Sequence, residues 1–170
     1  YDITTSGTAT FNNAGTVTQS GSASSISVSS FSNTGTVDVT GGTLTLTTGG
    51  TDTGNYTVSS GATLTFSGGT RDLNSGVSIS GAGTFSNAGS TVNVNTGSAI
   101  TTTNISQSSG TTTFSTGGAV NISNLTISGG TLTASDNLTI TSGMTFTVGT
   151  ISGTGTLTTN SGTTTAVGSG

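Results

Sequence analysis

Phe11-Asn12-Asn13-Ala14-Gly15-Thr16-Val17 returns twenty positions later as Phe31-Ser32-Asn33-Thr34-Gly35-Thr36-Val37, and a third copy begins with Phe85-Ser86-Asn87-Ala88-Gly89. A second phrase, Gly42-Thr43-Leu44-Thr45-Leu46, is answered at the same spacing by Ala62-Thr63-Leu64-Thr65-Phe66. A repeat this short cannot bury a core alone, so it must stack on near-copies of itself. The repetition therefore predicts that residues 1–170 form one solenoid domain.

The local pattern indicates how each turn of the solenoid is built. Apolar residues come as i, i+2 pairs, such as Leu44/Leu46 and Leu64/Phe66, which places each pair on one face of a strand. The gaps between pairs are too short for a helical crossover between parallel strands, which needs a dozen or more residues. We therefore predict an all-β fold, a parallel β-helix (β-solenoid) of about 8 coils of roughly 20 residues, with about three short strands per coil.

An antiparallel sandwich or barrel is the alternative fold. Its strongest sequence signal is an Asn-Gly or Asp-Gly dipeptide between two alternating runs. The chain contains neither dipeptide. Its Gly-Gly, Ser-Gly and Asn-x-Gly signals fit stacked corners as well as hairpins.

The Phe-x-Asn-x-Gly phrase has a physical interpretation within a β-helix. We expect the aromatic ring to point inward and to stack on the ring of the next coil. The asparagine is expected where the chain bends, because it tolerates left-handed dihedrals and hydrogen-bonds to nearby backbone, and stacked asparagines can form a ladder. The glycine then relieves the turn. The residues concerned are Phe11, Asn13, Gly15, Phe31, Asn33, Gly35, Phe85, Asn87 and Gly89.

Composition narrows the class of protein. Gly, Ser, Thr and Asn make up about two-thirds of the residues, and the chain has no Pro, Cys or His and a formal net charge of -4. With one basic residue, nucleic-acid binding is not expected, and no apolar run is long enough for a membrane helix. Low charge with abundant Ser, Thr and Gly favours an extracellular protein. No cofactor is expected.

Candidate catalytic chemistry is sparse. Without His, Cys, Glu or Lys, the usual activators of nucleophiles are missing, so we do not expect an enzyme. Asp52 and Asp72 are twenty residues apart, so they could lie at the same register on adjacent coils, where two like charges would need a cation or Arg71 between them. We interpret them as a solvated pair near Arg71 and keep them as weak candidates for a Ca²⁺ site.

Outward-facing threonines are the candidate binding surface. Thr43, Thr45, Thr63 and Thr65 flank inward Leu or Phe, and stacking would place their hydroxyls and methyls in ranks. Such ranks resemble the ice-binding surface of some antifreeze proteins, and they also suit surface glycans. The alternative is that Thr simply favours an exposed strand position.

Three stretches carry a resemblance to a known family: Gly35-Thr36-Val37-Asp38-Val39-Thr40-Gly41-Gly42-Thr43-Leu44-Thr45-Leu46, Gly61-Ala62-Thr63-Leu64-Thr65-Phe66-Ser67-Gly68-Gly69-Thr70 and Ile79-Ser80-Gly81-Ala82-Gly83-Thr84-Phe85. They resemble the β-strand repeats of large bacterial surface adhesins, akin to filamentous haemagglutinin and autotransporter passenger stalks. The likeness covers most of residues 31–160. It implies a secreted, rod-like stalk or filament used in adhesion or in a biofilm matrix, and it carries over no functional residue.

The two ends of the chain are candidate assembly surfaces. An isolated solenoid needs polar caps, and the Lys or Pro that would protect an open strand edge is missing. Residues 1–10, with Tyr1 and Ile3, are expected to stack on or be donated to another copy, and residues 160–170 read as a linker or tail. The expected partner is therefore the protein itself.

Overall fold

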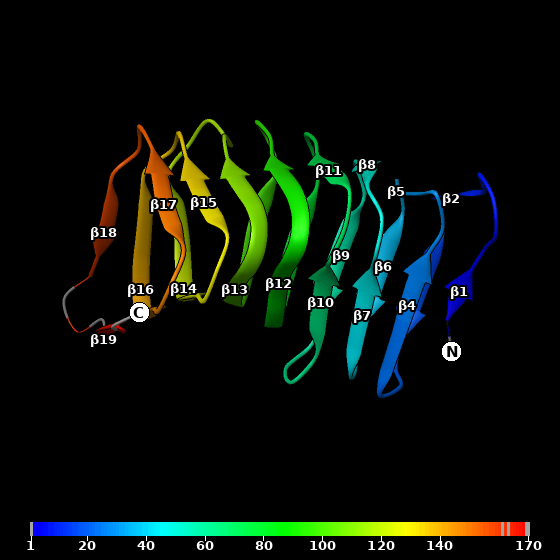
Figure 1. Cartoon of the computed structure of the whole chain (residues 1–170), viewed down its shortest axis with the longest axis horizontal. Coiled ribbons are helices and arrows are strands. Elements are labelled where there is room, and N and C mark those ends of the chain that lie inside the picture. The colour runs from blue at the N-terminus through cyan, green and yellow to red at the C-terminus, as the bar shows by residue number, and fades with distance from the viewer. Residues whose placement is uncertain (1, 161, 163, 169–170) are drawn as a thin grey trace.

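The chain winds into a parallel β-solenoid of about 8 turns. The computed structural model describes residues 2–160, 162 and 164–168. Figure 1 shows the turns side by side along the long axis, with the N-terminus at one end and the C-terminus at the other. Every strand pairing among the described residues is parallel, at spacings of about twenty residues. The prediction of a parallel β-helix is confirmed, and the antiparallel alternative is wrong.

Each turn contributes a strand to each of three faces, which we number in chain order. Face 1 is formed by β2 (Thr10–Asn13), β5 (Ser30–Asn33), β8 (Gly50–Asp52), β11 (Thr70–Leu73), β15 (Thr131–Ala134) and β17 (Thr150–Gly153). Face 2 is formed by β3 (Thr16–Gln19), β6 (Thr36–Val39), β9 (Asn55–Val58) and β18 (Leu157–Thr159). Face 3 is formed by β1 (Ile3–Thr4), β4 (Ala23–Ser27), β7 (Thr43–Leu46), β10 (Thr63–Phe66) and β19 (Thr164–Val167).

Four longer strands turn the corners between faces without a break. They are β12 (Ser78–Val94), β13 (Ala99–Phe114), β14 (Val120–Ile127) and β16 (Leu138–Phe146). The first of them pairs in succession with β9, β10 and β11, so one strand serves faces 2, 3 and 1. Because the pairing is in register, each side chain lies in a row of side chains that runs along the rod.

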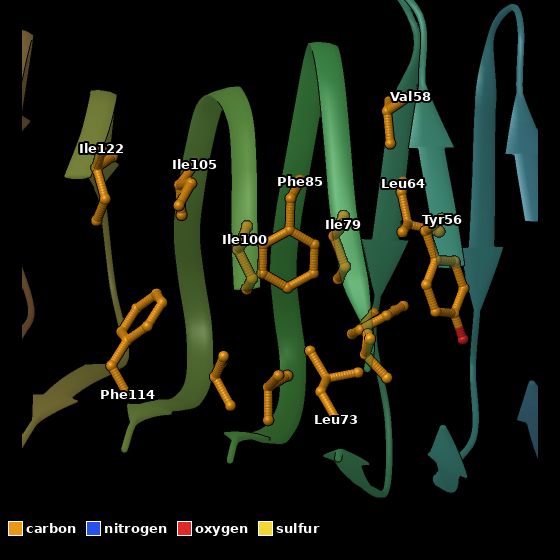
Figure 2. Close-up of a cluster of buried hydrophobic side chains, with 14 of the residues drawn as sticks. Tyr56, Val58, Leu64, Leu73, Ile79, Phe85, Ile100, Ile105, Phe114 and Ile122 are labelled. Carbon is orange, nitrogen blue, oxygen red and sulfur yellow. The ribbon is translucent and has the colours of Figure 1, made fainter. Parts of the chain in front are cut away.

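The interior is filled by the alternate side chains of all three faces. In Figure 2, Leu64 and Phe85 from face 3 and Ile79 and Ile100 from face 2 point into the same interior space. The Phe66 and Phe85 rings meet edge to face at 5.1 Å between centroids, a geometry that aromatic pairs favour. Burying one such side chain contributes about 1.5–3 kcal/mol, so the repeated i, i+2 pairs supply the core.

The three copies of the Phe-x-Asn phrase do not share one row. Phe11 pairs with Phe31 on face 1, and their rings lie 5.3 Å apart. Phe85 lies on face 3, where it pairs with Leu64. The expectation of one aromatic ring per coil in a single stack is therefore wrong for the third copy. Each copy of the phrase places a phenylalanine and an asparagine inward just before a corner. The first two copies lie at the corner after face 1, and the third lies at the corner after face 3.

The asparagines of the phrase take extended backbone. No described residue other than glycine has a positive φ, so the left-handed conformation expected of Asn13, Asn33 and Asn87 is wrong. Each lies at an inward strand position and is buried, and a strand requires extended dihedrals. The expected hydrogen bonds to nearby backbone are present: Gly15 and Gly89 each donate their N–H, at 3.2 Å, to the side-chain oxygen of the asparagine two residues earlier.

Both terminal segments contribute strands. In β1, Ile3 pairs with Ile26 and Thr4 with Ser27 of the same chain. The segment 160–170, expected to be a linker or tail, contains β19, which pairs with residues 143–146 of β16. Val167 continues an inward row there, which alternation along a strand explains. Tyr1 lies outside the described residues.

Candidate functional sites

A chain of buried polar side chains runs along the corner between faces 1 and 2. Asn13 Nδ2 donates to Asn33 Oδ1 at 2.8 Å, so the predicted asparagine ladder exists for this pair. The backbone N–H of Asn33 donates to Asp52 Oδ1 at 2.8 Å. One turn further, the same row holds Leu73. The ladder therefore ends on a buried carboxylate.

Arg71 neutralises that carboxylate inside the solenoid. Its Nη1 donates to Asp52 Oδ2 at 2.7 Å, and both side chains have no exposed surface. Nη1 also donates to the carbonyl oxygen of Phe31 at 3.2 Å, and Nη2 donates to that of Thr48 at 3.0 Å. A buried charge needs such partners, because leaving one unpaired costs several kcal/mol. The only basic side chain in the sequence is thus an internal structural element.

The space for the guanidinium comes from a glycine. Gly50 follows Phe31 in its row and precedes Arg71, and a Cβ on Gly50 would lie 1.7 Å from the Phe31 carbonyl oxygen. Arg71 fills the volume that the missing side chain leaves. Its guanidinium carbon lies 5.5 Å from the ring centroid of Phe31 and 4.8 Å from that of Phe66, within the range of cation–π attraction.

Asp52 and Asp72 are not brought together. Arg71 lies opposite Gly50, so Asp72 lies opposite Thr51 and Asp52 lies opposite Leu73. A shift of one residue turns a side chain to the other face of a strand. Asp52 is inside, whereas Asp72 faces outward and accepts a hydrogen bond from Asn93 Nδ2 at 2.7 Å. The solvated pair and the weak Ca²⁺ site expected from the twenty-residue spacing are therefore wrong.

Tyr56 belongs to the same cluster. It has no exposed surface, its ring meets Phe66 at 5.9 Å, and its hydroxyl accepts a hydrogen bond from Arg71 Nη1 at 3.5 Å. Burial raises the pKa of the Tyr56 phenol well above its usual value of 10.0, because the ionised form would lose its hydration; Arg71 lowers the pKa and the Asp52 carboxylate raises it. The phenol is therefore neutral at physiological pH.

A second buried polar cluster lies between faces 3 and 1. Thr112 Oγ1 donates to Gln107 Oε1 at 2.7 Å and accepts from Asn87 Nδ2 at 2.9 Å. Asn87 Oδ1 accepts the N–H of Ser90 at 2.9 Å. These neutral groups satisfy one another, as buried polar groups must. Like the first cluster, this one is sealed from solvent and fixes a corner.

The remaining acids serve as backbone or hydroxyl acceptors. Asp2 accepts the N–H of Ser25 at 2.7 Å, and this bond lowers the pKa of its carboxyl. Thr57 donates its hydroxyl to Asp38, and Thr116 donates its hydroxyl to Asp136. Within the described part of the chain, no three acidic, His or Cys side chains gather as they would around a metal ion.

The threonines expected on the surface do form a pair of ranks on face 3. Thr43 pairs with Thr63, and Thr45 with Thr65, and all four are half-buried. The first rank continues through Thr84 and then changes to asparagine at 104 and 124. The second rank carries a hydroxyl in seven consecutive turns, at residues 25, 45, 65, 86, 106, 126 and 145, and the next position in the sequence is Ala166.

Face 1 carries a longer threonine rank that the sequence patterns did not single out. Consecutive turns place threonine at 70, 91, 111, 131 and 150, and each is paired with the next. Beside it run Thr113, Thr133 and Ser152. In the sequence, this rank is a threonine that recurs every 19 to 21 residues. The recurrence is hard to recognise because the inward residue that follows each threonine changes, from Arg71 to Val92, Thr112 and Leu132.

Within residues 2–160, 162 and 164–168, both ends of the rod present strands that pair on one side only. At the N-terminal end, β2 pairs with β5 and β3 with β6. At the C-terminal end, β17 pairs with β15 and β18 with β16. Inward apolar residues there are incompletely covered: Ile3 is 44% exposed and Val167 is 74% exposed, and Phe11, Val17, Ile151 and Leu157 are only partly buried.

A cavity of about 500 Å³ opens beside the first turn. Ile3, Gln19, Ile26 and Leu44 are among the residues that line it. The Gln19 amide nitrogen is buried and has no hydrogen-bond partner among the residues that the structure describes, whereas most buried polar atoms in proteins have one. The N-terminal end thus combines an unpartnered buried amide with apolar side chains that are only partly covered.

No family model, curated protein or solved structure matches this chain. Among the described residues there is no helix that is long and apolar enough to cross a membrane.

Proposed function

We propose that this protein is a structural subunit or segment of an extracellular filament or stalk that assembles end to end, in adhesion or in a biofilm matrix. The observation that carries the proposal is the pair of open ends, where the described end strands pair on one side only and inward side chains are partly exposed. Such edges are templates for pairing with another chain. The resemblance to bacterial adhesin stalks and the low charge support the extracellular setting.

The interior supports a mechanical role over a chemical one. The charged pair and both polar clusters are sealed inside the turns, where they fix corners. Catalysis is not part of the proposal, because the acids outside the core are engaged with hydroxyls, amides and backbone N–H groups.

Electron microscopy of the purified chain at rising concentration tests the proposal. We expect short rods at low concentration and uniform fibres above a threshold, because the ends associate by mass action. Ile151→Asp, an inward residue of the last face 1 strand, should raise the threshold, whereas Thr113→Asp, an outward residue of face 1 two turns earlier, is the matched control and should not. Short rods at every concentration would contradict the proposal.

A second candidate function uses face 1. Its two adjoining hydroxyl ranks, Thr111/Thr113, Thr131/Thr133 and Thr150/Ser152, are in register and favour binding of surface glycans or ice. Thr111→Val and Thr131→Val would remove hydroxyls from the rank while keeping the strand shape. Glycan binding and ice recrystallisation assays on the wild type and on this double variant test the idea, with Thr43→Val/Thr63→Val on face 3 as the comparison.

A further inference from the structure

We propose that β1 is a cap over the N-terminal end of the solenoid, and that β19 of a second copy displaces it when two copies stack head to tail. This inference rests on the proposed end-to-end assembly.

The register follows from rows that run the length of the rod. The row of Phe11 on face 1 reaches Ile151 in the last turn. On face 2, Val17 and Leu157 are the first inward residues of the first and last strands, β3 and β18. If β17 of one copy pairs with β2 of the next, Ile151 lies over Phe11 and Leu157 lies over Val17. Partly buried apolar side chains on both ends then cover each other.

The same register supplies a partner for the orphaned amide. Thr159 ends β18 two residues after Leu157, just as Gln19 ends β3 two residues after Val17. Stacking therefore places the exposed Thr159 hydroxyl over the Gln19 side chain. A hydroxyl oxygen can accept a hydrogen bond from Gln19 Nε2, which has no partner within the described chain.

Face 3 contains a conflict that the stack must resolve. The first full turn is β2, β3 and β4, and the last is β17, β18 and β19. When β17 lies against β2 and β18 against β3 of the next copy, β19 must lie against β4. That position is already taken, because β1 pairs with β4 in its own chain. The outer edge of β4 can therefore pair either with β1 of its own chain or with β19 of the second copy, but not with both.

The strand contacts favour β19 in this exchange. β1 pairs with β4 through Ile3 and Thr4, both exposed. The flanking residues add hydrogen bonds from Ser25 N–H to Asp2, from Thr5 N–H to the Ser27 carbonyl, and from the N–H and hydroxyl of Ser29 to the carbonyls of residues 9 and 7. β19 has four residues in its ladder with β16, and by continuity of the rows Val167 would lie over Ile26 in the place of Ile3. If β19 forms a ladder of the same length on β4 of the next copy, it replaces the two paired residues of β1 by four and covers more of the open end. We therefore expect the cap to leave only when a second copy arrives.

A reversible lock tests the displacement. Thr4 and Ser27 are in register on adjacent strands, about 5 Å apart at Cα, which a disulfide spans. The chain has no cysteine, so the double variant T4C/S27C closes a single bridge that holds β1 on β4. The matched control is T10C/S30C, which ties β2 to β5 and leaves the outer edge of β2 free.

We expect oxidised T4C/S27C to remain as short rods at concentrations where oxidised T10C/S30C forms fibres, and to form fibres once reduced. Equal fibre growth by both oxidised variants would overturn the cap. If the wild type itself forms no fibres, the proposed function fails instead, so the two failures are distinct.

A variant that weakens the pairing of β1 with β4 should change fibre formation in the opposite direction and lower the threshold concentration. Ile3→Asn should lower the threshold concentration for fibres by about tenfold, which corresponds to about 1.4 kcal/mol. Loss of fibres in this variant would show instead that β1 is donated to the neighbouring copy and would overturn the inference.

Mixing T18C with T158C should give an intermolecular disulfide, since these outward residues meet across the junction, whereas T16C with T158C, two residues out of register, should not.

Discussion

At the scale of single residues, the buried Arg71–Asp52 pair is the feature on which the N-terminal half depends. The two side chains have no exposed surface and join an asparagine ladder to the aromatic core. Charges in such a place stabilise only as a pair, because the cost of desolvation remains when one partner is removed.

The pair should therefore show strong energetic coupling. Arg71→Met or Asp52→Asn alone is expected to lower the free energy of unfolding by about 3–5 kcal/mol, since each leaves the other charged group buried without its counter-charge. The double variant should lose less than the sum of the two. Urea denaturation of the four proteins measures the cycle, and additive losses would contradict the coupling.

Tyr56 gives the fold a pH dependence on the alkaline side. Its folded pKa lies well above the unfolded value of 10.0, so above that pH the unfolded chain releases a proton that the folded chain keeps. The free energy of unfolding should be constant with respect to this group below pH 10 and should fall as the pH rises beyond it. Denaturant melts between pH 8 and 11 measure the slope, which Tyr56→Phe should reduce.

At the scale of the strand, successive turns stack so closely that their corners leave little space for a side chain. The phrase on face 1 ends in Gly15 in one turn and in Gly35 in the next. A Cβ on Gly35 would lie 2.2 Å from the Gly15 carbonyl oxygen, whereas a Cβ on Gly15 meets nothing within 4 Å. The same sequence position is therefore crowded inside the stack and open at its end.

These two glycines provide a matched pair of variants. Gly35→Ala should destabilise the fold by about 1–3 kcal/mol, because the corner must shift to admit the methyl group. Gly15→Ala should be neutral or slightly stabilising, by about 0.4–1 kcal/mol, through the unfolded chain. Thermal unfolding of both variants is the measurement, and equal effects would show that the corners do not stack tightly.

At the scale of the whole molecule, the fold turns a chain with one basic residue into a rod with that residue inside. Trypsin requires Lys or Arg in an accessible, extended segment, and Arg71 is fully buried between two turns. Resistance of the native rod then depends on how often the stack opens around Arg71.

The native protein should consequently stay intact in trypsin for as long as it stays folded. In denaturant, cleavage after Arg71 should give the two fragments 1–71 and 72–170. The rate of loss of the intact band at increasing urea measures the population of the open form. Rapid cleavage under native conditions would show that the turns around Arg71 open locally.

The sequence alone determined the solenoid, its turn of about twenty residues and the inward positions of its Leu, Val, Ile and Phe pairs, because alternation and repetition are local properties of the chain. Only the tertiary structure decided where the turns are nineteen or twenty-one residues long. One such turn sets Arg71 opposite Gly50, which puts Asp52 inside with Arg71 and leaves Asp72 outside. It also decided that Phe85 stacks on Leu64 and not in the row of Phe31. A strand whose pairing slips by one residue turns its side chains to the other side, and the packing of all the turns together selects the turn length that keeps the apolar residues inside.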